Sequence, residues 1–555
     1  MSNQEAMPEN TGEQKKHIRI RVPVIGLAVL IWALSFITDT KIFSGDGLNM
    51  NCLPVDTSMT LFMHIATKLC VLAFWYLFLT FLTKLWEKKD LLIVFVILLA
   101  VYGAGLAITY PGYYMNDDPI IFAYATRFLP VYWHNYLTSL FYMTAMSIFP
   151  ASCGPVLLSD VCYACFFTLI YEKGLSLIKG KNLLPRVLLI LPGLLPFTLL
   201  GALMCFRPAI YSSFFLLYFI LLYFDKKTGT GFTPKRLILY ALLTAVLSLW
   251  RSESIVLLPL SVILIFLAFK PTGKQLLTFF LASLCLYAVI SIPQKGGENK
   301  YYGSDYLILS TTRPLSVIVW RDQTYPGADE DIANISAVTD FGYLHNDSLS
   351  CSAYNRYNSD HNEGRYTQTG ADKQTQSRYL KSAFNLIAHN FDLYLGERLQ
   401  LFCVTNGFYN YNKAMVLNLK PVISSDFHLY EHDRDYGFEM LDAYRRVPLT
   451  RHDGWALFLF AAGGEAFLPV LVLCFALLIL SLFKKKWFGF FFFGALLARE
   501  AVIFLTAPAS FIQYSYPTMY VAATVTLVTL ALWADRRSSS RTEEKQGAES
   551  SVSEE

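Results

Sequence analysis

Residues 91–109 read LLIVFVILLAVYGAGLAIT, and the next ten residues, 110–119, read YPGYYMNDDP. The first stretch has no charged residue and is long enough for a helix to cross a hydrocarbon core about 30 Å thick. The second stretch places Asp117 and Asp118 just beyond the end of that run. A carboxylate at membrane depth costs about 2.5 kcal/mol or more, so an acidic pair at the boundary favours a functional interpretation.

The composition extends this pattern to the whole chain. Of the 555 residues, 54% are hydrophobic and 16% are charged, whereas a soluble domain carries about 25% charged residues. Repeated apolar segments of spanning length account for the deficit and predict an all-α polytopic membrane protein. The net charge of +4 and the lack of a basic block indicate no nucleic-acid partner.

Charge bias orders the spans. With the N-terminus inside and twelve spans, every strongly basic short loop lies in the cytoplasm, as the positive-inside rule requires. A thirteenth candidate, Asn135–Phe149, would reverse every later loop, so we expect it to lie along the outer surface as a membrane-hugging helix. The sequence therefore predicts twelve spans in the plasma membrane with both termini cytoplasmic. They lie near residues 22–38, 60–83, 91–109, 154–172, 183–203, 208–224, 236–250, 254–269, 276–293, 456–482, 487–506 and 517–534.

These spans divide the chain into five parts. We expect a cytoplasmic tail at 1–21, a transmembrane core at 22–294 with an outer juxtamembrane catalytic loop at 110–153, and one large extracytoplasmic loop domain at 295–455. Spans at 456–534 and a disordered cytoplasmic tail at 535–555 complete the chain. Within the loop domain, Gln376–Cys403 has helical periodicity, whereas Ser304–Trp320 has a strand-like pattern.

The loop domain also contains a short metal-like motif. His428-Leu429-Tyr430-Glu431-His432 matches the HxxEH pattern of one class of zinc proteases. The Asp- and Gly-containing sequence that follows does not favour a sustained helix, and a five-residue pattern recurs by chance. We interpret the motif as a solvated loop and predict no metal site there.

Charged and polar residues gather at the predicted outer ends of the spans. The two carboxylates there are Asp117 and Asp118, and the candidate binding residues are Arg127, His134, Arg207, Arg251, Arg499 and Tyr514. Arginine grips phosphate through a planar, always charged fork. A carboxylate can accept the proton of an attacking hydroxyl or hold a divalent cation. This combination suits a reaction between a phosphate-bearing lipid and a polar acceptor.

Each of these residues also has a purely structural interpretation. Asp117-Asp118-Pro119 is a common way to start a helix. Arg207 and Arg251 sit at headgroup level, where arginine side chains often snorkel. Arg499 can pair with Glu500, and His134 can be an ordinary interfacial residue.

The layout resembles the polyprenyl-phosphate-dependent membrane glycosyltransferases of the GT-C type, the group of the protein mannosyltransferases and the lipid A aminoarabinose transferases. The resemblance is carried by Tyr110-Pro111-Gly112 followed by Asp117, by His134 before the segment Tyr136–Phe149, and by His389–Arg398. The usual His-Pro-Pro is His134-Asn135-Tyr136 here. The usual Arg-Tyr pair before the last span is Gln513-Tyr514, which moves the expected phosphate ligands to Arg207 and Arg251.

The resemblance implies inverting sugar transfer at the outer leaflet from a polyprenyl-phosphate-linked donor to a glycan, lipid or protein acceptor. Asp117 would act as base or orienter, and Asp118 as alternative base or as ligand of a divalent ion. Enzymes of this group differ in their need for a metal, so Mg²⁺ or Mn²⁺ stays open as a cofactor.

Two other functions fit the same outline. A surface-polysaccharide polymerase or ligase would act on diphosphate-linked oligosaccharides and depend on loop arginines such as Arg445, Arg446 and Arg451. A twelve-span transporter or flippase is the third interpretation. It is less favoured because transporters keep ionisable residues near the bilayer midplane and often show repeat symmetry, which this sequence lacks.

Overall fold

The computed structural model of the chain is helical throughout the part that it describes, and no β-strand occurs among those residues. They are residues 11–37, 39, 57–112, 114, 118–132, 134–151, 153–205, 207–301, 305–339, 372–405, 467–507 and 512–552. An all-α architecture is what a chain of repeated apolar segments must adopt in lipid, because a helix satisfies all its backbone hydrogen bonds internally.

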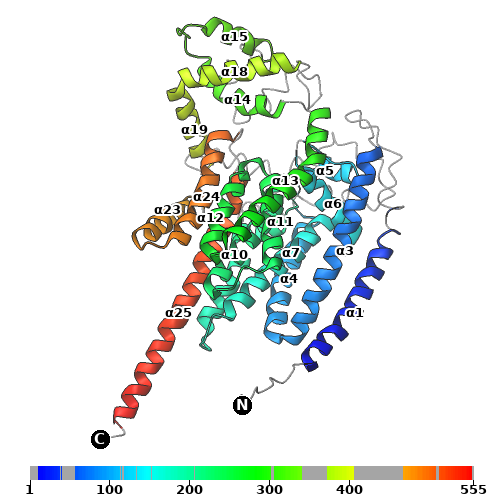
Figure 1. Ribbon diagram of the computed structural model, residues 1–555, viewed down its shortest axis with the longest axis vertical. Helices are drawn as coiled ribbons and strands as arrows, with labels where there is room; N and C mark the ends of the chain where they lie inside the picture. Colours follow the sequence, from blue (N-terminus) through cyan, green and yellow to red (C-terminus); the bar gives the residue numbers. More distant parts are fainter. Residues whose placement is uncertain are drawn as a thin grey trace, which may run out of the picture.

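Most of the helices form one bundle, drawn from blue to orange-red in Figure 1. Neighbours in sequence pack against each other there, including α3 on α4 and α23 on α24. More distant helices also pack together: α11 contacts α13, and α25 returns from the end of the chain to pack on α10 and α8. The bundle elements are α1 (Thr11–Leu34), α3 (Thr57–Glu87), α4 (Lys89–Thr109), α5 (Asp118–Ala125), α6 (Tyr136–Ile148), α7 (Gly154–Leu175), α8 (Leu183–Ile190), η1 (Leu191–Leu194), α9 (Pro196–Ala202), α10 (Arg207–Thr228), α11 (Pro234–Trp250), η2 (Ser252–Ser254), α12 (Leu257–Phe269), α13 (Gly273–Tyr301), α23 (Phe467–Phe483), α24 (Trp487–Thr506), η5 (Ile512–Ser515) and α25 (Tyr516–Val552).

Eight helices among the described residues are long and apolar enough to cross a membrane, and a bent pair, Leu183–Leu194 with Pro196–Ala202, makes nine if it counts as one span. Every predicted span coincides at least in part with a helix or with this bent pair. Three of them are too short to pass the same test: Val22–Leu34, Phe467–Phe483 and the 17-residue α11. The chain is thus an all-α protein with several membrane-spanning helices, and the number twelve stays a prediction.

Helix α1 begins and helix α25 ends at the same end of the molecule, which we call the basal end; the opposite end is the apical end (Figure 1). Hydrogen bonds and ion pairs join the segments near the basal end. The Asp535 carboxylate accepts from the backbone N–H groups of Lys179 and Gly180 at 2.9 Å, and Glu172 pairs with Lys84 and Lys88. These are the basic loops that charge bias assigns to the cytoplasm.

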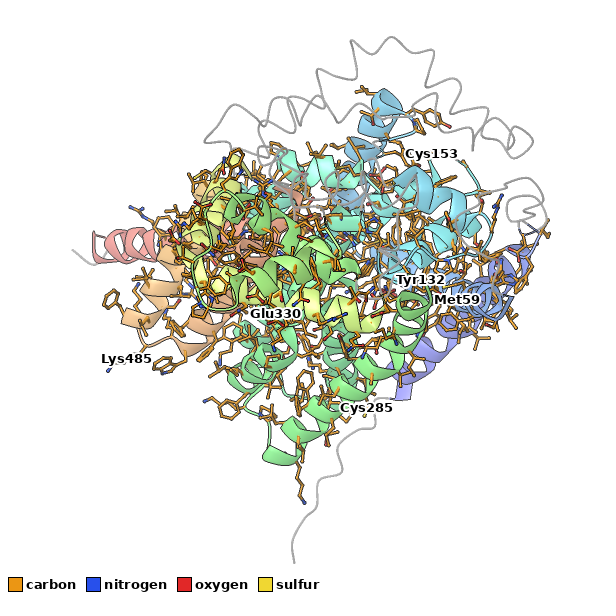
Figure 2. The ribbon with its side chains drawn as sticks, turned by 90° about the horizontal axis from the view of Figure 1, so that it is seen from above. Met59, Tyr132, Cys153, Cys285, Glu330 and Lys485 are labelled. Carbon is orange, nitrogen blue, oxygen red and sulfur yellow. The ribbon has the colours of Figure 1, made fainter. Side chains whose placement is uncertain are left out.

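A second group of helices, at the apical end, has its own small hydrophobic core. This apical helical group consists of α14 (Asp305–Ile318), α15 (Ala328–Ser336), α18 (Lys373–His389) and α19 (Phe391–Thr405). Its core joins Ile308, Leu315, Ile318, Tyr379 and Leu386, among others. Figure 2, seen from above, places Glu330 of α15 between Met59 on one side and Lys485 at the other edge.

Two predictions about the apical helical group meet different outcomes. The helical periodicity of Gln376–Cys403 is confirmed, although Asn390 divides the segment into α18 and α19. The strand-like interpretation of Ser304–Trp320 is wrong, because 305–318 forms α14. Ile308, Leu315 and Ile318 lie seven and three residues apart, a helical spacing that turns all three into the small core.

One other expectation needs correction, and two helices extend into predicted tails. The predicted surface helix forms as α6, but ten of its thirteen residues are buried against α3, α5 and α7, so it is a packed element of the bundle. The tail at 535–555, expected to be disordered, continues α25 as far as Val552. No proline interrupts that sequence, and Glu, Lys, Arg and Gln are good helix formers. At the other end, α1 already begins at Thr11, within the predicted tail.

Candidate functional site

The apical ends of four bundle helices bring charged side chains together. Arg207 begins α10, Arg251 follows the last residue of α11, and η5 precedes α25. Arg499 lies on α24, seven residues before its end at Thr506 and therefore about 10 Å from it along the axis. We call the set Arg207, Arg251, Glu253, Arg499, Glu500 and Tyr514 the arginine site.

Glu253 is the centre of the arginine site. Its Oε1 atom pairs with Nε of Arg251 and lies 2.9 Å from Nη2 of Arg499. Arg207 also acts electrostatically on this carboxylate. One glutamate therefore interacts with three arginines that come from different elements.

Arg499 is completely buried, and each nitrogen of its guanidinium group has a partner. Its Nε donates to the Ser254 hydroxyl at 3.1 Å, and its Nη1 donates to the Tyr514 carbonyl at 2.7 Å. Nη1 also lies 3.3 Å from Glu500. The pairing of Arg499 with Glu500 that the sequence suggested is thus present, and Arg499 also pairs with Glu253 of another element.

Glu500 is held separately. Its Oε2 accepts from Ser515 at 2.7 Å and its Oε1 from Thr518 at 2.5 Å. The carboxylate is therefore saturated by hydroxyl groups and by Arg499, as a buried charge requires. This makes Glu500 a fixed countercharge of Arg499.

Arg251 has one hydrogen-bond donor that its described neighbours do not use. It is only 3% exposed, and its Nη1 is buried with no hydrogen-bond partner among the described residues. Its guanidinium lies 5.3 Å from the ring centre of Tyr514 and 6.0 Å from that of Tyr211, within the range of cation–π attraction. A buried donor without a partner costs about 1–3 kcal/mol, so Arg251 Nη1 is the natural point for an acceptor group of a ligand.

The surroundings of this donor point in the same direction. Arg499 is completely buried, and the guanidinium groups of Arg251 and Arg499 share one carboxylate, that of Glu253. Guanidinium groups form strong charge-assisted hydrogen bonds with anionic oxygens. The site is therefore suited to an anionic acceptor group.

Asp118 lies near this site but on another element. It begins α5 and is fully buried, so it starts a helix as Asp-Pro often does, but not a surface helix. Its carboxyl interacts electrostatically with the Tyr142 hydroxyl and the Cys205 thiol. Burial, followed by the charge of Asp118, raises the pKa of Tyr142 well above its ordinary value. Cys205 precedes Arg207 by two residues, so Asp118 lies near the start of α10.

The segment that contains His134 is fixed to α11 and α13. Asn135 Nδ2 donates to the Leu249 carbonyl at 3.1 Å, and the Trp250 indole donates to Thr138 at 2.9 Å. Gln294 of α13 bonds to the backbone of both Tyr132 and Tyr136. The buried His134 is therefore attached to the end of α11, just before Arg251.

The predicted site residues thus fall into four sets. Arg251, Arg499 and Tyr514 are in contact, with Arg207 close by; Asp118 and His134 border this region on α5 and on the segment before α6. Arg127 is half-buried just beyond the end of α5. Asp117 lies outside the described residues, as does the HxxEH motif at 428–432.

The sequence interpretation missed one buried carboxyl. Asp160 lies in α7, is 1% exposed, and neither of its oxygens has a hydrogen-bond partner among the described residues. It interacts electrostatically with Tyr102 and Cys153. The available signal was an acidic residue in the middle of the apolar run 154–172, whose other acidic residue, Glu172, stands at its end. Intramembrane ionisable residues are functional candidates by default.

No group of three or more His, Cys, Asp or Glu that could hold a metal ion occurs in the described part of the chain. Comparisons with protein-family models, with curated proteins and with solved structures give no match.

Proposed function

We propose that this chain is an integral membrane glycosyltransferase that transfers a sugar from a polyprenyl-phosphate donor to a cell-surface or secreted acceptor at the outer face of the plasma membrane. The observation that carries the proposal is the buried Arg251 Nη1 without a partner among the described residues, in a site where the buried guanidinium groups of Arg251 and Arg499 share the Glu253 carboxylate. Guanidinium groups bind phosphate oxygens through charge-assisted hydrogen bonds.

The proposal includes the topology. Twelve spans with both termini in the cytoplasm put the apical end outside the cell, which agrees with the beginning of α1 and the end of α25 at the basal end. The arginine site would then lie about one to two helical turns below the outer surface, where a lipid phosphate can reach it. The apical helical group would lie on the acceptor side.

The roles follow from chemistry. Arg251, supported by Arg499 and Arg207, would hold the phosphate and stabilise its charge as the sugar–phosphate bond breaks. Asp118, or Asp117 beside it, would accept the proton of the acceptor hydroxyl as that oxygen attacks the anomeric carbon. Tyr514, His134 and Arg127 would line the donor or acceptor. Mg²⁺ or Mn²⁺ stays open as a cofactor, and a divalent ion would assist the leaving phosphate.

The test uses matched variants in the native membrane. Asp118→Asn and Asp117→Asn, at unchanged expression, are expected to leave the acceptor without sugar while the donor lipid accumulates. Arg321→Gln is the control, because the Arg321–Asp392 pair is exposed and lies in the apical helical group. Intact glycosylation in both aspartate variants would refute the assignment of the acidic pair.

Two further experiments separate the alternatives. If the protein is a polymerase or ligase, Arg445→Ala should yield shorter surface polysaccharide. Arg445, Arg446 and Arg451 all lie outside the described residues. A transporter or flippase would move substrate in proteoliposomes that contain no acceptor. Either result, with normal sugar transfer in Asp118→Asn, would replace the proposal.

A further inference from the structure

The connection between α24 and η5 is held at both ends by arginines. The Ala507 carbonyl, directly after α24, accepts from Arg398 Nη1 at 2.8 Å. The Tyr514 carbonyl, in η5, accepts from Arg499 Nη1 at 2.7 Å. One of these arginines belongs to the arginine site and the other belongs to the apical helical group.

Arg398 is built into its position. It is fully buried on α19 and pairs with the neighbouring Glu397, which also pairs with Arg313 of α14. A glutamate shared by two arginines fixes the direction of each guanidinium. The apical helical group therefore presents Arg398 to α24 as a rigid donor.

A second residue of α19 reinforces this contact. Tyr394 lies four residues before Arg398, hence on the same face of the helix, and its hydroxyl donates to the Leu505 carbonyl at 2.7 Å. Arg398 Nη1 also reaches this carbonyl at 3.5 Å. The last carbonyls of a helix have no partner within it and attract positive charge, so α19 supplies the cap of α24.

The cap bears on the arginine site because α24 also carries Arg499 and Glu500. Leu505 follows Arg499 by six residues, about 9 Å along one rigid helix. On the other side of the connection, the Tyr514 ring lies against Arg251. A shift of the α24 end would therefore move both Arg499 and the ring that faces Arg251.

We infer that Arg398 is a positioning residue for the arginine site: it couples the docking of the apical helical group on α24 to the placement of Arg499 and Tyr514, and so to the binding of the donor phosphate. The inference rests on the proposed function of that site. Such couplings amount to about 5–150-fold in affinity. Loss of the Arg398 cap should therefore weaken phosphate binding although Arg398 does not touch the phosphate.

The test measures binding of farnesyl phosphate, an isoprenoid monophosphate, to the purified full-length protein in detergent. Arg398→Gln is expected to raise the Kd roughly tenfold. Arg398→Lys, which keeps one donor for the Ala507 carbonyl, should recover most of the affinity. Tyr394→Phe is the milder second variant if Arg398→Gln does not fold, with an expected rise of about threefold. Arg321→Gln, an exposed pair in the same group, should bind as the unmodified protein does.

The outcomes distinguish the inference from the proposed function. Equal Kd values for Arg398→Gln, Tyr394→Phe and the unmodified protein, with Arg251→Gln strongly weakened, would overturn the inference alone. Equal Kd values for Arg251→Gln and the unmodified protein would overturn the phosphate site itself. A purely structural role of Arg398 would lower the unfolding temperature of the apical helical group and leave the Kd below that temperature unchanged.

Discussion

Arg499 Nη2 lies 2.9 Å from Oε1 of Glu253, although the two residues are 246 positions apart in the sequence. The pair joins α24, near the end of the chain, to η2 at the end of α11. Both side chains are buried. The contact therefore closes the bundle around the arginine site and sets the electrostatics of the whole cluster.

Removing the carboxylate should destabilise the protein strongly. Glu253→Gln leaves Arg251 and Arg499 buried with less countercharge, and breaking a buried pair costs about 3–5 kcal/mol. We expect a clearly lower midpoint of thermal unfolding in detergent. Arg321→Gln, which breaks an exposed pair, should change stability by no more than about 1 kcal/mol. Equal midpoints for the two variants would show that Glu253 is not a required countercharge.

Topology can be tested at two exposed tryptophans. Trp86 is 82% exposed beside the basal Lys84–Glu172 contact, and Trp320 is 58% exposed in the apical helical group. With the ten native cysteines replaced, Trp320→Cys should react with a membrane-impermeant maleimide in intact cells. Trp86→Cys should react only after permeabilisation. The reverse pattern would invert the assigned orientation and move the arginine site to the cytoplasmic side.

The apical helical group should be sensitive to acid. Burial by itself would raise the pKa of Asp331, but hydrogen bonds from Tyr325, Ser382 and Asn385 lower it below its ordinary value of 3.8. Because the folded pKa is the lower one, the stabilisation is present above pH 3.8 and is lost as the pH falls through the folded value.

Hydrogen exchange of peptides from α15 and α18, corrected for the intrinsic rate, measures this loss. Protection should fall below about pH 4 in the unmodified protein. In Asp331→Asn the same peptides should show no such step. A step of equal size in both proteins would assign the acid sensitivity to another group.

The sequence predicted the helices of the bundle well because a spanning helix needs only a long apolar run, and that signal is local. It also gathered Arg251, Arg499 and Tyr514 into one expected surface, since charge bias places the ends of their spans on the same side. The partners of those side chains cannot be read from the local sequence. The contact of Arg499 with Glu253, for example, depends on how α24 packs beside η2.

The failures have the same origin. Ser304–Trp320 contains several residues that favour strands, and the helix forms because Ile308 and Leu315 bury together against Tyr379 of α18. The expected surface helix became the buried α6 because an apolar face does not specify whether lipid or protein will cover it. Arg398 stands in the segment His389–Arg398 that carries the resemblance, but its contact with α24 had no sequence signal, since that contact depends on the end of a helix more than 100 residues later.

Replacing Asp160 tests whether this buried carboxyl is needed for function although it lowers stability. A buried carboxyl with no hydrogen-bond partner among the described residues costs about 1–3 kcal/mol, so Asp160→Leu should raise the midpoint of thermal unfolding. Asp225→Leu is the matched control with the opposite sign, because that buried carboxylate accepts from Arg236 at 3.0 Å and from Tyr240 at 2.9 Å. A more stable Asp160→Leu protein that no longer transfers sugar would identify a carboxyl retained for function at the expense of stability. A lower midpoint in Asp160→Leu would instead show that the carboxyl stabilises α7.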